Sequence, residues 1–415
     1  MKSTYHKIAS YEAKKGTFKK ILLLYSGGLD TSVMIKWLMD HYDAEIHTLT
    51  INLGQEDNNF DEIKQKAINL GVKKATILDA QKEFAEDFLT KAIKANANYQ
   101  HGYHLFCPLG RAVIAKKVVE VAQKEKINVL AHGCTGKGND QVRFDSYLTT
   151  LDPSIKILAP VREWEMTRTE EIAYAKKHKI PLSSHSKEYS YDENLWGISA
   201  EGGDIEDVSK EPNLKKILLK NKLPEDSSPK PANVSIDFEK GIPVKLNGKK
   251  IDMVNMLKAL ATLGAEHGIG TRIFVEDRIF GLKVRGVYEQ PAAEILVSAH
   301  QELEKLVSTR DENEFKAGID AKWAYLCYSA KWLEPLMDNL NSFIDKHNEK
   351  VTGKVTCKLY KGNFLVTAID SPYSLFDQKM ASFDSKNHFN QQASAGFIEL
   401  YSMQQKMAYQ VSKRQ

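Results

Sequence analysis

Residues 21–32 read ILLLYSGGLDTS, an apolar run that changes at Tyr25 into a glycine turn rich in hydroxyl groups. The first five residues have the composition of a buried strand, and a helical pattern begins at Thr31. Gly27 and Gly28 permit a tight turn and a close approach of the backbone to a ligand. The first N–H groups of a helix have no partner within it and carry the positive end of its dipole. The stretch therefore predicts an anion site, with polyphosphate as its natural ligand.

An ordinary strand-to-helix turn, capped by Asp30 or Thr31, is the alternative interpretation of this stretch. The density of Ser, Gly, Asp and Thr directly after a strand favours the anion site. The run lacks the Gly-x-x-x-x-Gly-Lys-Ser/Thr spacing of an ordinary P-loop, so it encodes no lysine for the terminal phosphates of ATP. It resembles instead the SGGxDS loop of the ATP pyrophosphatase superfamily. That resemblance implies that the loop holds a departing pyrophosphate and that substrates are activated by adenylylation.

Strand-like and helical runs alternate from residue 19 to residue 184. The expected strands are 21–25, 44–52, 75–79, 128–132 and 156–159, and the expected helices are 31–41, 61–70, 83–95, 111–125 and 169–178. This alternation predicts an α/β fold, a doubly wound parallel sheet whose ligand lies outside the carboxyl ends of the strands.

The texture of the sequence changes after residue 184. A polar, proline-bearing stretch at 211–231 predicts a long loop, and mixed strands (233–237, 242–246) and helices (252–267, 292–308) predict an α+β domain. We therefore expect a polar N-terminal extension at 1–18, a nucleotide-binding domain at 19–184, an α+β domain at 185–390 and a C-terminal helix at 391–415.

Composition indicates a soluble globular protein of more than one domain. The chain has 415 residues, of which 42% are hydrophobic and 27% charged, and no apolar run suggests a signal peptide or a membrane partner. A cytoplasmic location is the expectation. The net charge of +4 is spread over interspersed acids and lysines, so we expect no nucleic-acid partner. Cys107, Cys134, Cys327 and Cys357 are widely separated, which predicts free thiols and no protein-built metal site.

A second polar cluster, HGCTGKGNDQVRFD at residues 132–145, follows the strand that ends there. Its glycines expose backbone, and Asn139, Asp140 and Arg143 supply charge and hydrogen-bonding groups beside the first loop if the sheet is doubly wound. A solvated helix-capping loop is the alternative.

Together the two stretches resemble the argininosuccinate synthase family. Further segments agree in order, at 189–190, 192–195, 198–199, 201–203, 275–278, 281–283, 285–289, 358–363 and 396–398. The resemblance covers roughly residues 19 to 400. It implies a synthetase domain at 185–390 and a homotetramer that binds citrulline, aspartate and ATP with Mg²⁺, in arginine biosynthesis. Citrulline would attack the α-phosphate and release pyrophosphate, and the aspartate amine would then displace AMP from citrullyl-AMP to give argininosuccinate.

The resemblance also assigns roles to individual residues. ATP would contact Leu24, Tyr25, Ser26, Gly27, Gly28, Leu29, Asp30, Thr31, Ser32, Ile51, Gly133 and Gly136. Aspartate would contact Thr135, Asn139 and Asp140, and citrulline Tyr103, Pro108, Asn139, Arg143, Ser190, Ser199, Glu276 and Tyr288. Asp30, Asp140 and Arg143 are the expected catalytic residues. Taken singly, the two tyrosines fit half-buried packing residues, and Glu276 and Arg143 fit a surface ion pair.

The chain departs from the family in the segment that leads to Arg111. There the family usually reads YLLGTSxARP, whereas residues 103–112 read YHLFCPLGRA, so the citrulline-contacting serine becomes Pro108. Proline has neither a hydroxyl nor an N–H group. Together with Val284, in place of the serine of the family's KSRG run, it leaves open a non-catalytic homologue or one that uses another ureido acid or amine. A tRNA-modifying ATP pyrophosphatase is a more remote alternative, because no cysteine pair, metal site or basic RNA-binding face is evident.

The C-terminal segment predicts an amphipathic helix. Leu400, Met403, Met407 and Val411 fall on one helical face, an apolar stripe too exposed for a lone terminal helix. We expect an arm that reaches another subunit, with packing against its own subunit as the alternative.

Overall fold

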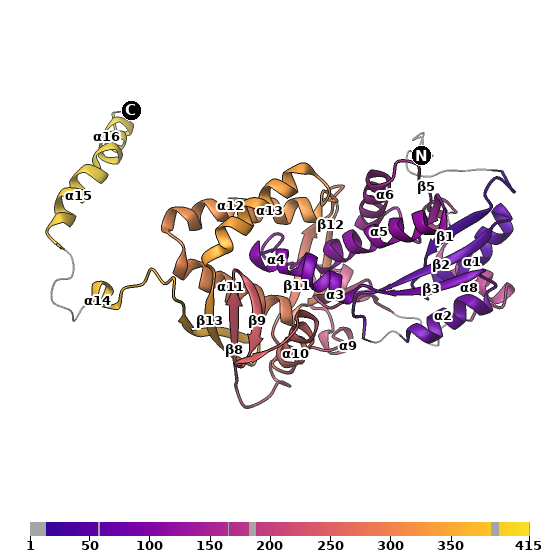
Figure 1. The fold of residues 1–415 in the computed structure, drawn as a ribbon, viewed down its shortest axis with the longest axis horizontal. Helices are drawn as coiled ribbons and strands as arrows, with labels where there is room; N and C mark the ends of the chain where they lie inside the picture. Colours follow the sequence, from indigo (N-terminus) through magenta and orange to yellow (C-terminus); the bar gives the residue numbers. More distant parts are fainter. Residues whose placement is uncertain (1–13, 57–58, 165, 182–187, 383–389, 415) are drawn as a thin grey trace.

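The computed structural model describes residues 14–56, 59–164, 166–181, 188–382 and 390–414. Residues 1–13 of the predicted N-terminal extension lie outside the described residues. Figure 1 shows the part with the parallel sheet at one end, a second part with two further sheets beside it, and a helical arm that extends away from both.

The first sheet is parallel, as predicted, with strand order β3-β2-β1-β4-β5. Its strands are β1 (Lys20–Leu24), β2 (Glu45–Asn52), β3 (Lys74–Asp79), β4 (Val129–Ala131) and β5 (Lys156–Leu158). Side chains of β1 alternate between two cores, with Ile21 and Leu23 in one and Leu22 in the other. The predicted doubly wound fold is confirmed.

The chain reverses its direction of progress across this sheet between β1 and β4. Leu22 pairs with Leu130 and Leu23 with Ala131, and the connections leave β1 toward β2 and β4 toward β5. Such a switch point is where ligands bind in open α/β sheets. Both glycine-containing loops of the sequence begin there.

Helices cover both faces of the sheet (Figure 1). They are α1 (Leu29–Tyr42), α2 (Phe60–Asn69), α5 (Phe106–Glu125), α6 (Asn139–Leu151), α7 (Pro160–Glu163) and α8 (Arg168–Lys177), whereas α3 (Gln81–Glu83) and α4 (Thr90–Lys94) lie against the second part. The helix predicted at 83–95 contains a π-helical stretch, Phe84–Leu89, between α3 and α4. The helix predicted from Arg111 begins at Phe106, because a buried face extends it through Pro108 and Gly110.

The second part contains two antiparallel sheets. One has the order β10-β9-β8-β13-β14 and consists of β8 (Ala232–Glu239), β9 (Ile242–Leu246), β10 (Lys249–Lys250), β13 (Gly353–Tyr360) and β14 (Asn363–Asp370). The other has the order β11-β12-β7-β6 and consists of β6 (Ser190–Asn194), β7 (Gly197–Glu201), β11 (Thr271–Asp277) and β12 (Lys283–Glu289). This is the α+β arrangement expected, although the sequence identified only β8 and β9.

Four long helices complete the second part: α10 (Met253–Glu266), α11 (Pro291–Val307), α12 (Arg310–Tyr328) and α13 (Pro335–His347). Two short 3₁₀ turns, Gly203–Glu206 and Asn348–Lys350, also occur there. The predicted long loop contains one short helix, α9 (Leu214–Ile217). None of the described helices is both long and apolar enough to cross a membrane.

The C-terminal arm contains α14 (Gln378–Ala381), α15 (Ala393–Tyr401) and α16 (Met403–Ser412). The last two form the predicted helix, interrupted at Ser402. Leu400, Met403, Met407 and Val411 are all exposed. The arm projects from the body (Figure 1), so the alternative of packing against its own subunit does not hold in this structure.

Candidate active site

The phosphate loop, residues 25–32, runs from the end of β1 into the first turn of α1. Gly27 has φ +80°, a conformation that favours glycine, and Gly28 is the extended residue that precedes α1. Ser26 Oγ lies 3.1 Å from Thr31 Oγ1 and accepts a 3.3 Å hydrogen bond from the N–H of Gly28. Hydroxyls and backbone N–H groups thus surround the start of the helix, where Asp30 lies in the first turn. This chemistry suits the oxygens of a polyphosphate.

Buried hydrogen bonds hold the phosphate loop in place. The Tyr25 hydroxyl lies 3.2 Å from Ser32 Oγ, which donates a 2.6 Å hydrogen bond to the carbonyl of Gly28. Thr50 of β2 donates to the carbonyl of Tyr25 over 2.7 Å. Leu24 lies at the end of β1, and Ile51 is buried in the neighbouring strand. The loop is therefore fixed before any ligand binds.

The second loop, residues 132–138, lies against the phosphate loop. A Cβ added to Gly133 would be 3.1 Å from the Thr31 methyl group, so the glycine permits this close approach. Thr135 and Gly136 are exposed in the loop, and α6 begins at Asn139. The structure thus brings together the two stretches that the sequence singled out.

A buried histidine supports the second loop. His132 Nδ1 accepts a hydrogen bond from the N–H of Cys134, and His132 Nε2 lies 2.7 Å from Asp145 Oδ1. Arg162 binds the other oxygen of Asp145 at 2.8 Å. The four cysteines are free thiols, as predicted.

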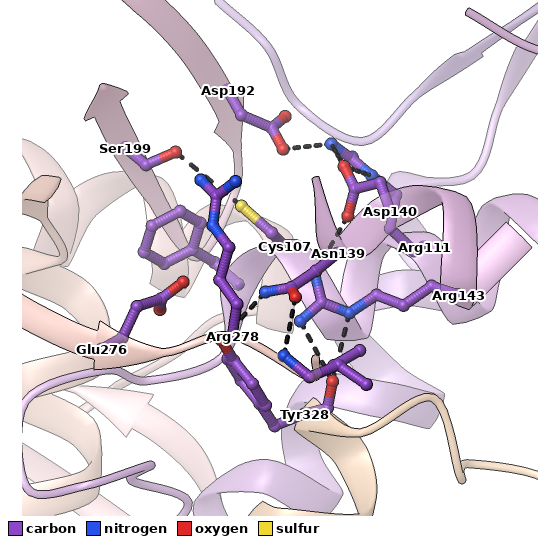
Figure 2. A network of polar contacts seen from close by, with 12 residues as sticks. Cys107, Arg111, Asn139, Asp140, Arg143, Asp192, Ser199, Glu276, Arg278 and Tyr328 are labelled. Carbon is purple, nitrogen blue, oxygen red and sulfur yellow. Dashed lines mark hydrogen bonds and ion pairs between the residues drawn. The ribbon is translucent and has the colours of Figure 1, made fainter. Parts of the chain in front are cut away.

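A charged cluster of Arg111, Asp140, Arg143 and Asp192 lies beside the two loops (Figure 2). Arg111 Nε donates a 2.8 Å hydrogen bond to Asp140 Oδ2, and Arg143 Nη1 binds Asp140 Oδ1 at 2.9 Å. Arg111 also forms an ion pair with Asp192. Burial alone would raise the pKa of Asp140, but the two guanidinium groups outweigh it and hold that pKa below its usual value. Asp140 therefore stays ionised.

Tyr328, the last residue of α12, connects the second part to α6. Its carbonyl accepts hydrogen bonds from Arg143 at 3.2 and 3.0 Å, and its hydroxyl accepts one of 2.9 Å from the Asn139 side chain. Asn139 Oδ1 in turn accepts from the N–H of Ile279 at 2.9 Å. The amide of Asn139 thus joins α6 to two distant segments.

The four-stranded sheet presents a second group of predicted residues. Ser199 and Tyr288 lie opposite each other on β7 and β12, and the Tyr288 hydroxyl donates a 3.0 Å hydrogen bond to Glu276 Oε2. Burial raises the pKa of Glu276. Figure 2 shows its carboxylate directed toward the space beside Arg278. Ser190 is exposed at the start of the edge strand β6.

Residues 103–112, the segment that departs from the family pattern, lie between the charged cluster and the predicted residues of the four-stranded sheet. Tyr103 is buried, 4.9 Å from Tyr288 between ring centroids, and its hydroxyl accepts a 3.1 Å hydrogen bond from the N–H of Cys107. Pro108 occupies the first turn of α5, where an N–H group has no acceptor within the helix. Proline therefore costs the fold no hydrogen bond there, but it offers none to a ligand.

The structure adds site residues that the sequence analysis did not assign: Arg111, Asp192, Arg278 and Tyr328. Arg278 bridges the two parts, binding Glu201 at 2.7 Å and the carbonyl of Lys137 at 2.8 Å. Arg111 had a signal in the sequence, because an arginine at the start of a predicted helix opposes the helix dipole and needs an acidic partner.

The parallel sheet with its switch point and the loop after β1 define the class of fold, a HUP domain. The arginosuccinate synthase N-terminal HUP domain model matches residues 20–181, and the arginosuccinate synthase C-terminal domain model matches residues 189–408. The argininosuccinate synthase of Pyrococcus furiosus is 47% identical over 94% of this chain and 94% of its own length. Those of Dictyoglomus turgidum and Symbiobacterium thermophilum are 46% and 42% identical, over 93% and 95% of this chain and 96% and 98% of their own lengths. The chain belongs to the argininosuccinate synthase family, whose members are carbon–nitrogen ligases of arginine biosynthesis.

Proposed function

We propose that this protein condenses citrulline with aspartate, using MgATP, to give argininosuccinate, AMP and pyrophosphate. The observation that carries the proposal is the juxtaposition of the phosphate loop and the charged cluster across the switch point between β1 and β4. The phosphate loop suits a leaving pyrophosphate, and the charged cluster suits amino-acid substrates. Family membership over nearly the whole chain supports the same reaction.

In the first step the ureido oxygen of citrulline attacks the α-phosphorus of ATP, and the bond to the β-phosphate breaks. The backbone and hydroxyl groups of the phosphate loop stabilise the negative charge of the departing pyrophosphate. Mg²⁺ enters as part of the MgATP substrate and neutralises phosphate oxygens. The donors present fit this role, because hydroxyls and the nearby Asp30 suit a hard cation, and no cluster of metal-ligating side chains occurs within the described ranges.

In the second step the aspartate amine attacks the ureido carbon of citrullyl-AMP, and the bond to AMP breaks. Asp140 stays ionised and so orients the amine, with Thr135 and Asn139 near the substrate carboxylates. Glu276 and Arg143 bind the ammonium and carboxylate groups of citrulline, and Tyr103, Ser190, Ser199 and Tyr288 complete that side. This catalysis depends on positioning and electrostatics.

The test is an incubation of the purified protein with MgATP, citrulline and aspartate. Pyrophosphate is followed by a coupled assay and argininosuccinate by mass spectrometry. Both products are expected in equal amounts. Pyrophosphate alone would indicate another amine acceptor, and neither product would contradict the proposal for citrulline.

A second candidate, an enzyme for another ureido acid, follows from one observation. Pro108 has no N–H group and the N–H of Cys107 is bound to the Tyr103 hydroxyl, so neither residue offers a backbone donor to a substrate carboxylate. A panel of ureido acids of different chain length, assayed for pyrophosphate release, separates the two candidates by their kcat/KM values.

We further propose a cytoplasmic homotetramer assembled through the C-terminal arm. The exposed apolar side chains of α15 and α16, including Phe397 and Leu400, support an arm that packs on another subunit. Truncation after Gly396 should lower the sedimentation coefficient. An unchanged coefficient of an intact oligomer would contradict the role of the arm.

A further inference from the structure

A lysine of α2, outside the phosphate loop, contacts the backbone of that loop. Lys66 lies in the last turn of α2, and its Nζ donates a 2.8 Å hydrogen bond to the carbonyl of Gly27. The same helix packs on the loop through Ile63, whose Cγ1 would lie 2.9 Å from a Cβ built on Gly27. Residues three apart in a helix share a face, so α2 fixes this glycine by packing and by a hydrogen bond.

The hydrogen bond sets the direction of a neighbouring donor. The carbonyl of Gly27 and the N–H of Gly28 belong to one planar trans peptide, so they point in opposite directions. With the carbonyl held toward Lys66, the N–H is held toward Ser26 Oγ, on the side of the loop hydroxyls. Two consecutive glycines are otherwise the most freely rotating part of the loop. Lys66 therefore restrains the peptide whose N–H group would donate a hydrogen bond to a phosphate oxygen.

The positive charge of Lys66 also favours the binding of a polyphosphate. The ammonium is partly buried, and burial lowers its pKa. No carboxylate of the described residues forms an ion pair with it. A positive charge that is partly desolvated, with no acidic partner among the described residues, raises the electrostatic potential of the loop, which an incoming or departing anion experiences.

We propose that Lys66 is a positioning residue for pyrophosphate, acting through the Gly27–Gly28 peptide and through its charge when the bond between the α- and β-phosphates breaks. The proposal rests on the proposed function and adds to it a cation that the sequence of the loop does not encode. The chemical class recognised is the polyphosphate of MgATP and the pyrophosphate product.

The test compares Lys66→Met with Lys64→Met, which removes the same charge from an exposed position on the same helix. Lys66→Met should lower kcat/KM for MgATP and weaken product inhibition by pyrophosphate, each by roughly 10- to 100-fold, because a charged hydrogen bond is lost. The KM for aspartate and the melting temperature without nucleotide should match those of Lys64→Met. Lys66→Arg should recover part of the loss, because arginine keeps both the charge and the donor.

Equal values for the two methionine variants would overturn the proposal. So would a loss in Lys66→Met that extends equally to aspartate and lowers the melting temperature, since Lys66 would then serve only the fold. If the parent protein forms no argininosuccinate, the proposed function fails by itself. Calorimetric binding of pyrophosphate to the two methionine variants still tests Lys66, with weaker binding to Lys66→Met expected and equal binding against the proposal.

Discussion

The phosphate loop and the charged cluster both lie at the carboxyl end of the parallel sheet, but they are built differently. The loop consists of consecutive residues whose backbone and hydroxyls form the cradle. In the cluster, Arg111, Asp140 and Asp192 come from α5, α6 and β6. The loop depends on local conformation, and the cluster depends on how the two parts of the molecule pack.

This difference separates two kinds of substitution. A change in the charged cluster should impair the amino-acid steps and leave MgATP binding intact, because the loop is held by its own contacts to β2 and α1. A change at Lys66 should have the opposite pattern. The predictions for Asp140 and Pro108 below therefore compare an effect on the amino-acid side with the binding or KM of MgATP.

The largest effect is expected for Asp140→Ala. It removes the carboxylate between Arg111 and Arg143 and leaves two guanidinium groups without their partner. Argininosuccinate formation should fall by at least about a hundredfold, while ATP binding measured by calorimetry stays within about threefold. Asp140→Asn, which keeps the shape, should lose nearly as much. Undiminished turnover in either variant would remove Asp140 from the site.

The buried carboxyl group of Glu276 leads us to expect that the KM for citrulline depends on pH. Burial raises the pKa of its carboxyl above the usual value. A raised pKa means that the carboxylate takes up a proton at higher pH than an exposed glutamate does. If it binds the citrulline ammonium, the KM for citrulline should rise by roughly tenfold per pH unit once the pH falls below that raised pKa.

The control for this prediction is Glu239→Gln, at an exposed site at the end of β8. Glu276→Gln should have a high KM for citrulline at every pH and no acidic rise, whereas Glu239→Gln should keep the parent profile. A citrulline KM that is independent of pH in the parent would contradict the role of Glu276.

A smaller effect is expected for Tyr328→Phe. It removes the hydroxyl bound to Asn139 but keeps the ring that stacks on Tyr99 at 3.8 Å and the carbonyl bound to Arg143. The same hydroxyl also forms a hydrogen bond with Glu276, and its loss should raise the KM for citrulline or aspartate by about 5- to 10-fold. Tyr325→Phe, on the exposed part of the same helix, should change neither. An unaltered KM in Tyr328→Phe would mean that Asn139 is held well enough by Ile279 alone.

The sequence predicted the loop better than the cluster for a physical reason. Strand-to-helix periodicity and the glycines around Gly27 are local signals, and they located β1, the turn and α1. The start of α5 was wrong because residues 106–110 include Pro108 and Gly110, weak helix formers that tertiary burial overrides. The Arg111–Asp192 pair and the contact of Tyr328 with Arg143 join segments far apart in the chain, so no local pattern encodes them.

The smallest expected effect concerns Pro108→Ser, and it tests whether the departure from the family matters on the amino-acid side. The substitution restores an N–H and a hydroxyl in the first turn of α5, where the free N–H groups of a helix favour a carboxylate. If citrulline is the substrate, its KM should fall by about 3- to 10-fold, and the KM for MgATP should not change. Pro335→Ser, at the exposed start of α13, makes the same replacement away from the site and should leave both constants unchanged. Equal citrulline constants in Pro108→Ser and the parent would mean that the contact is replaced or irrelevant, and that the side chains of Arg143 and Glu276 suffice to hold the substrate.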